Sequence, residues 1–109
     1  MDIHFTARRF KAHRDVRDYA MEAIKKLDKY YDGIVRSDII LSFERSMNSV
    51  KTAEIVLRVD RTTLSAKEKS EDFVKSLDIA VGKLERQLEK YKTKIRKKDK
   101  KTLRSVKGK

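Results

Sequence analysis

The stretch SDIILSFERSMNSVKTAEIVLRVDRTTLSAKE, residues 37–68, decides the fold because apolar and polar residues alternate along three successive segments. Alternation with a period of two predicts half-buried β-strands. The inward residues are Ile39, Leu41 and Phe43, then Ala53, Ile55, Leu57 and Val59, then Leu64 and Ala66. The links at residues 47–50 and 60–61 are hairpin-sized, so the stretch predicts an antiparallel meander.

A strand and a helix precede this meander. The N-terminal residues MDIHFTARR alternate in the same way and predict a first strand. Between Arg14 and Tyr31 the apolar spacing changes to three and four, which predicts a helix. We expect His13 at its N-cap and Gly33 at its end. A strand that reaches the next strand through a helix favours a parallel, right-handed crossover.

A second, longer helix follows the meander. Its apolar residues recur with helical spacing from Phe73 to Ile95. We expect Ser70 to cap it, with Glu71 and Asp72 in its first turn, where carboxylates suit the helix dipole.

These elements predict an α+β domain with the order β-α-β-β-β-α. Its four-stranded mixed sheet is covered on one face by two helices. We expect this domain to occupy residues 1–96. Residues 97–109 are expected to form a basic, disordered tail, because like charges repel and little apolar surface is left to bury.

Charge is concentrated at the C-terminal end of the chain. The 109 residues carry a net charge of +12, of which residues 90–109 contribute +10, from eleven Lys or Arg and one Asp. Positive and negative charges therefore nearly cancel in the rest of the chain, and the C-terminal segment is a cationic extension. Such an extension is expected to meet a polyanion.

Several classes of protein are disfavoured by what the sequence contains. There is no cysteine, hence no disulfide or thiolate metal site, and no apolar run approaches the roughly 20 residues that span a bilayer. The two histidines, His4 and His13, form no metal-binding pair, and no P-loop or nucleophile elbow occurs. We predict a cytoplasmic protein that is not an enzyme, with no cofactor, metal or small-molecule substrate.

The charges of the second helix are sorted by sign. On a wheel of about 100° per residue, five cations fall in one row, which we call the cationic stripe: Lys83, Arg86, Lys90, Lys94 and Lys97. The acidic residues Glu71, Asp78, Glu85 and Glu89 fall on the opposite flank. A helix that needed only solubility would be expected to mix its signs at i, i+4. The stripe therefore predicts a surface for a phosphate backbone.

Smaller basic groups lie elsewhere in the sequence. Lys25 and Lys29 form an edge on the first helix, and Arg8 lies with Arg9 and Lys11 where the first strand ends. We include Lys25, Lys29 and Arg8 among the predicted RNA-binding residues.

Aromatic residues give little sign of base reading. The rings at inward positions are Tyr19, Tyr91, Phe5, Phe43 and Phe73, which predicts that they belong to the core. Tyr30 is the ring expected to be exposed. Since no strand carries the paired exposed aromatics of an RRM, we expect recognition of backbone and shape.

The segment SEDFVKSLDIAVGKLERQLEKYKTK, residues 70–94, resembles the second helix of the ribosome hibernation-promoting factor family, which includes the ribosome-associated inhibitor A proteins. The KLERQL block, residues 83–88, is the most specific part of the resemblance, and MDIHFTARRF and IKKLDKYYD are also similar to the family. The resemblance covers about residues 1–97.

This resemblance implies a stress factor that binds the small ribosomal subunit, against 16S-type rRNA, in the channel used by mRNA and tRNA. Translation is thereby blocked. It implies rRNA contacts at Lys83, Arg86, Lys90 and Lys94, with Lys25 and Lys29 in support. Longer relatives pair ribosomes through a further domain, and we expect this chain not to pair ribosomes alone. We also expect it to be a monomer off the ribosome.

Two other interpretations stay open from the sequence. A generic double-stranded-RNA-binding module also places two helices on an antiparallel sheet. A basic amphipathic helix could lie on an anionic membrane, although the sheet needs the apolar face of that helix as a cover.

Overall fold

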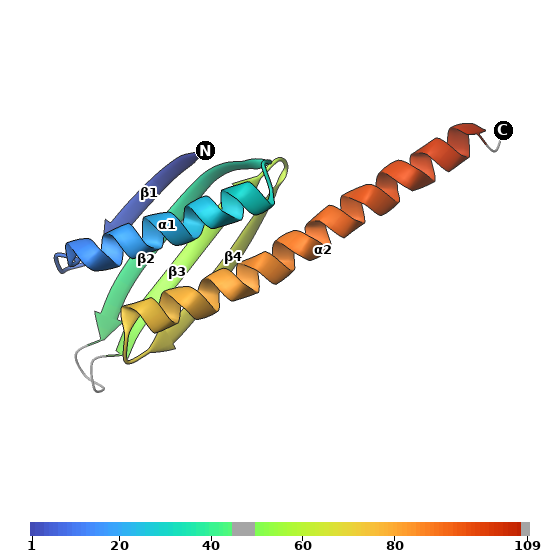
Figure 1. The fold of residues 1–109 in the computed structure, drawn as a ribbon. Coiled ribbons are helices and arrows are strands. Elements are labelled where there is room, and N and C mark those ends of the chain that lie inside the picture. Colours follow the sequence, from blue (N-terminus) through green and yellow to red (C-terminus); the bar gives the residue numbers. More distant parts are fainter. Residues whose placement is uncertain (45–49, 108–109) are drawn as a thin grey trace.

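Six elements follow one another in the predicted order, β-α-β-β-β-α (Figure 1). In the computed structural model the described residues are 1–44 and 50–107, with side chains described for 1–43 and 50–94. The elements are β1 (Asp2–Ala7), α1 (Arg14–Tyr30), β2 (Ile34–Glu44), β3 (Val50–Val59), β4 (Thr62–Ser70) and α2 (Phe73–Lys107). The predicted link at residues 47–50 lies almost wholly outside the described residues.

The four strands form one mixed sheet in the order β1-β2-β3-β4. β1 runs parallel to β2, whereas β2, β3 and β4 form the predicted antiparallel meander. Val59 pairs with Thr62, and Asp60 takes a left-handed φ of 44°, so residues 60–61 make the expected tight turn. The predicted α+β fold with a four-stranded mixed sheet is confirmed.

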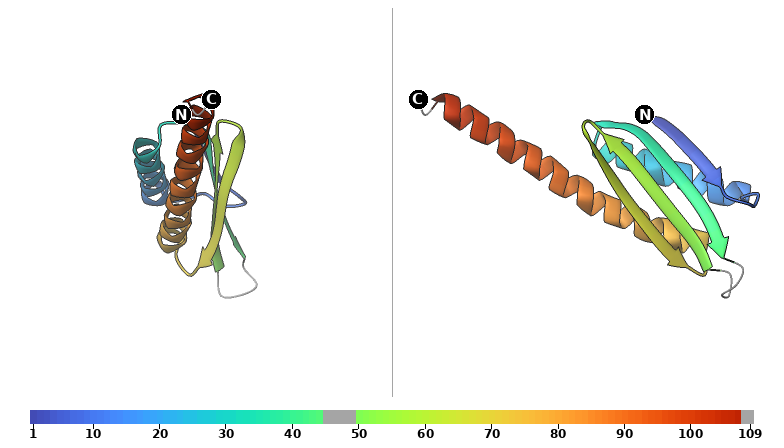
Figure 2. Two further views of the ribbon diagram at one scale, coloured as in Figure 1. Left: turned by 90° about the vertical axis from the view of Figure 1, so that its right-hand side faces the viewer. Right: turned by 180° about the vertical axis from the view of Figure 1, so that it is seen from behind.

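Both helices lie on the same face of this sheet (Figure 2). The core lies between the two helices and the sheet, because the inward residues of strands and helices meet there. The largest fully buried side chains include Ile24 and Leu27 of α1, Ile39 and Leu41 of β2, Ile55 and Leu57 of β3, and Leu77, Leu84 and Leu88 of α2. Burial of such a side chain contributes about 1.5–3 kcal/mol, so the helical layer is held mainly by apolar contact.

The end of α1 differs from the prediction. The helix stops at Tyr30, and Tyr31 is already extended, with its N–H donating to the carbonyl of Leu27 at 3.0 Å. Gly33 has no left-handed φ, so it does not end the helix as expected. A Cβ on Gly33 would lie 2.7 Å from the ring of Tyr31, so any other residue there would require the Tyr31 side chain to shift.

The start of α2 also differs. Ser70 belongs to β4 and α2 begins at Phe73, so Ser70 is not the helix cap. The Ser70 hydroxyl accepts from the N–H of Asp72 at 3.2 Å and lies 2.6 Å from the hydroxyl of Ser76. Ser76 in turn donates to the carbonyl of Lys51 at 2.9 Å. Ser70 therefore joins a polar link between the ends of β3 and β4 and the first turn of α2, a role set by tertiary contacts.

α2 continues well past the sheet and gives the molecule its length of 63 Å (Figure 1). The described helix reaches Lys107, whereas the sequence predicts a disordered tail from residue 97. The domain boundary at residue 96 stays a prediction. The backbone of α2 therefore carries its cationic C-terminal half away from the rest of the fold.

Candidate nucleic-acid interface

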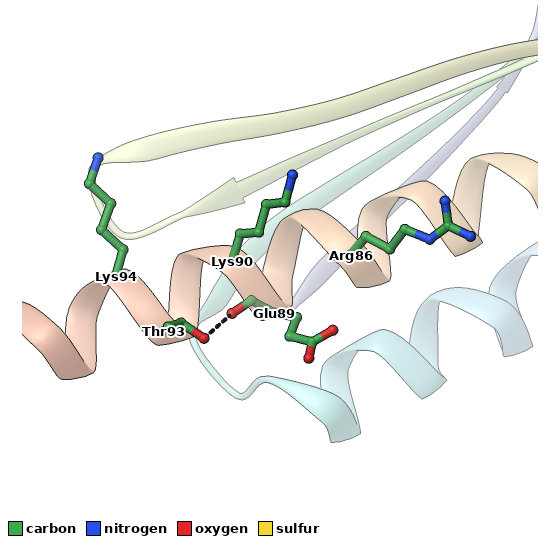
Figure 3. A pocket seen from close by; sticks show the side chains of 5 residues that line it. All are labelled: Arg86, Glu89, Lys90, Thr93 and Lys94. Carbon is green, nitrogen blue, oxygen red and sulfur yellow. Dashed lines mark hydrogen bonds between the residues drawn. The ribbon is translucent and has the colours of Figure 1, made fainter.

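The outer surface of α2 has a shallow hollow where the cationic stripe passes. It has a volume of about 540 Å³, and the residues around it, which we call the basic hollow, are Arg86, Glu89, Lys90, Thr93 and Lys94. The ammonium groups of Lys90 and Lys94 point to one side of α2, the Arg86 side chain runs along α2 toward its N-terminal end, and the Glu89 carboxylate points to the opposite side, toward α1 (Figure 3). Three cations thus line a surface that is open to solvent.

These three cations are not neutralised by the rest of the described protein. Arg86, Lys90 and Lys94 are exposed. Among the residues whose side chains the structure describes, none makes an ion pair or side-chain hydrogen bond with them. Two like-charged i, i+4 pairs occur here, Arg86 with Lys90 and Lys90 with Lys94. Each pair destabilises the helix by roughly 0.2–0.5 kcal/mol. An anion seated there would relieve that repulsion.

Lys83, at the start of the cationic stripe, is placed differently. Its ammonium pairs with the carboxylate of Glu68 on β4, whose side chain is 18 % exposed. One turn later, Gln87 Nε2 donates to the carbonyl of Ser65 on the same strand at 2.9 Å. Lys83 and Gln87 therefore fasten α2 to β4. The prediction that Lys83 contacts RNA has no support from this geometry.

Lys92 makes a third attachment, which sequence reasoning missed. Its ammonium donates to the carbonyl of Tyr30 at 3.3 Å and lies 4.6 Å from the centre of the Tyr30 ring. A cation at the last turn of a helix is favoured by the helix dipole and by the unpaired carbonyls there. Tyr30 is 42 % exposed, as predicted, but one face of its ring is occupied by Lys92. No local sequence pattern could have paired residues 62 positions apart.

The acidic flank of α2 faces α1. A groove of about 300 Å³ between the helices is lined by Tyr19, Glu22, Ala23, Lys26, Asp78, Val81, Gly82 and Glu85. Of the predicted acidic flank, Asp78 and Glu85 line this groove, whereas Glu71 precedes α2 and pairs with Lys75 at 3.4 Å. Tyr19 is 39 % exposed, so its predicted place in the core is wrong. Its hydroxyl instead donates to Asp78, and this hydrogen bond raises the Tyr19 pKa.

The other predicted site residues are not brought into the basic hollow. Lys25 lies on α1 and pairs with Glu22 at 3.6 Å, a contact between two largely exposed side chains. Lys29 is exposed in the last turn of α1, and Lys26 rather than Lys25 or Lys29 lines the groove toward α2. Arg8 follows β1, where its N–H donates to the carbonyl of Leu41 at 2.9 Å. The backbone of Lys97 is helical, but its side chain lies outside those described.

Nothing in the described part of the chain is arranged for metal chemistry. Across those residues, no group of three or more His, Asp or Glu side chains could hold an ion. His13 has a local role, because its Nδ1 accepts from the N–H of Asp15 at 3.2 Å and caps α1 as predicted. Within the described chain, neither helix combines the length and the apolar character that a membrane crossing requires.

Comparison with known proteins gives matches along most of the chain. Residues 3–96 match the family described as Sigma 54 modulation protein / S30EA ribosomal protein. The ribosome hibernation promotion factor of Staphylococcus aureus (strain COL) is 32 % identical over 97 residues, which are 83 % of this chain and 51 % of that protein. The chain thus spans about half the length of this curated relative.

Two solved structures share the fold. A ribosomal subunit interface protein from Coxiella burnetii superimposes with a TM-score of 0.77 at 25 % identity, covering 85 % of this chain and 99 % of the other. The N-terminal domain of Thermus thermophilus Protein Y gives a TM-score of 0.72 at 26 % identity, covering 84 % and 99 % respectively. The similarity therefore extends over the whole β-α-β-β-β-α unit, with the basic hollow inside it.

Proposed function

The chain belongs to the Sigma 54 modulation protein / S30EA ribosomal protein family of ribosome hibernation factors, which are not enzymes, and from that membership we propose how it acts. It binds the small ribosomal subunit in the channel that mRNA and tRNA use, and it blocks translation under stress while it stays there. It carries out this role in the cytoplasm as a monomer that needs no cofactor.

The basic hollow is the observation that supports an RNA surface. Three exposed cations, Arg86, Lys90 and Lys94, line the same hollow on α2 and have no described acidic partner. Successive cations four residues apart are about 6 Å apart along a helix, which suits neighbouring phosphates. Arg86 can add bidentate hydrogen bonds, whereas the two lysines act as point charges. The expected recognition is of backbone and shape, because stacked pairs of exposed rings do not occur on the described surface near the hollow.

Co-sedimentation with purified small subunits tests this function directly. We expect the protein to pellet with small subunits and to be displaced when tRNA and mRNA are added together, because all three need the same channel. Binding should weaken steeply with salt, since phosphate contacts release counterions. A long RNA duplex is the comparison ligand. Equal or stronger binding to the duplex, or binding to subunits together with tRNA and mRNA, would support a generic double-stranded-RNA module instead.

Lys83 is proposed to position α2 rather than to touch RNA, because its ammonium is paired with Glu68. The charge swap Glu68→Lys with Lys83→Glu keeps both the ion pair and the net charge. We expect the affinity of the swap variant for small subunits to stay within about threefold of that of the unmodified protein. Lys83→Glu alone places two carboxylates side by side, so its affinity should fall about tenfold or more, which corresponds to about 1.4 kcal/mol.

The measurement is the dissociation constant for small subunits at a fixed moderate salt concentration. A swap variant as weak as Lys83→Glu would show that the ammonium of Lys83 itself meets phosphate. Circular dichroism of all three proteins ensures that the comparison is made between folded chains.

A further inference from the structure

A second group of unpaired cations lies on the loop between β1 and α1, at the end of the sheet away from the projecting half of α2 (Figure 1). This loop, residues 8–13, has the sequence RRFKAH, and Arg8, Arg9 and Lys11 are all exposed. None of the three has an ion pair or side-chain hydrogen bond with a described residue. Three cations within four residues are thus exposed and make no ion pair with the residues whose side chains the structure describes.

The loop is anchored at three places. At its start the N–H of Arg8 extends the pairing of β1 with β2 by donating to the carbonyl of Leu41 at 2.9 Å. In its middle Phe10 stacks on Phe73, the first residue of α2, with ring centres 5.3 Å apart, and meets the edge of Phe43 at 5.2 Å. At its end His13 caps α1. The cations are therefore presented from a backbone that is held by β2, α1 and α2.

Arg9 occupies a backbone conformation that does not suit it. Its φ of 62° lies in the left-handed region, where glycine and asparagine are tolerated and an ordinary side chain is strained. Such strain persists only where the surroundings hold the residue in place, and it concentrates at functional sites. Glycine or asparagine would take up this conformation with less strain, so the arginine points to a role for its charge.

The loop and the basic hollow are too far apart to share one small ligand. Phe10 packs at Phe73, and Arg86 follows thirteen residues later on α2. At about 1.5 Å per residue this separates the two surfaces by about 20 Å along the helix. An extended polyanion can meet both, because phosphates recur along a nucleic-acid strand.

We propose that the β1–α1 loop is a second anchor for the RNA phosphate backbone, contacted by Arg8, Arg9 and Lys11 several nucleotides away from the basic hollow. This inference rests on the proposed function, since both surfaces are assigned to the same ribosomal RNA. Two separated anchors fix the orientation of an elongated protein on its target, which one row of cations along a helix cannot do alone.

The variant Arg9→Asn tests the anchor with little risk to the fold. Asparagine accepts a left-handed φ, so the free energy of unfolding in urea should be unchanged or slightly higher. The affinity for small subunits should fall about three- to tenfold. The slope of log affinity against log salt should become shallower by about 0.7–0.9, the value for one phosphate contact. Arg8→Glu with Lys11→Glu should lose more, by at least tenfold.

Arg61→Asn is the matched control. It removes one exposed arginine from the β3–β4 turn, where residue 60 is also left-handed, and it should leave affinity and salt slope unchanged. If Arg9→Asn keeps the affinity and the salt slope of the unmodified protein, the proposal of a second anchor is wrong. It is also wrong if Arg61→Asn loses as much affinity as Arg9→Asn. The proposed function fails separately, if the unmodified protein does not bind small subunits at all.

Discussion

Reversing Arg86 and Lys90 to Glu should weaken binding to small ribosomal subunits at least 100-fold at moderate salt, or about 2.7 kcal/mol. The two cations line the basic hollow and have no described acidic partner. Reversal therefore removes two phosphate contacts and adds two carboxylates that repel the same phosphates. Both side chains are exposed, so neither change opens the core.

The matched control for this variant is Arg61→Glu with Lys67→Glu, which changes the net charge equally at two other exposed cations. If general attraction between a basic protein and RNA dominates, both double variants should lose affinity alike. If the basic hollow is the binding surface, the control should stay within about threefold of the unmodified protein, because distant exposed charges are largely screened beyond roughly 10 Å. If the Arg86/Lys90 variant still co-sediments with small subunits, the basic hollow is not the binding surface.

Leu84→Ala should lower the free energy of unfolding by about 2–5 kcal/mol, because truncating a fully buried leucine loses apolar contact and leaves a cavity. Leu84 has no exposed surface and belongs to the same KLERQL block as Arg86. It lies on the face of α2 that covers the sheet. The measurement is urea unfolding followed by circular dichroism.

Arg86→Ala is the matched control, since it makes the same replacement two residues later on the exposed side of α2. It should change the free energy of unfolding by less than about 0.5 kcal/mol, as surface substitutions usually do, while it weakens subunit binding. Leu84→Ala should show the opposite pattern under conditions where it is still folded. Equal destabilisation by the two variants would mean that α2 is not seated on the sheet through Leu84.

The KLERQL block shows how far its sequence alone could be interpreted. Its resemblance to a family and its helical period were both visible, and the family and the fold are confirmed. The period also placed Leu84 and Leu88 inward correctly. It could not tell which of the polar side chains would find a partner: Lys83 and Gln87 are held by β4, and Arg86 makes no ion pair with a described residue.

What the sequence by itself determined is the order of the elements, the apolar faces and the sorting of charge along α2, because each depends on a local period of 2 or 3.6 residues. What only the tertiary structure decided is which polar groups find partners. Lys83 meets Glu68 and Lys92 meets Tyr30 across the fold. Ser70 joins a polar link instead of capping a helix, and Tyr19 lies outside the core, where its hydroxyl donates to Asp78. Those pairings depend on distances between residues far apart in the chain, and no local period contains that information.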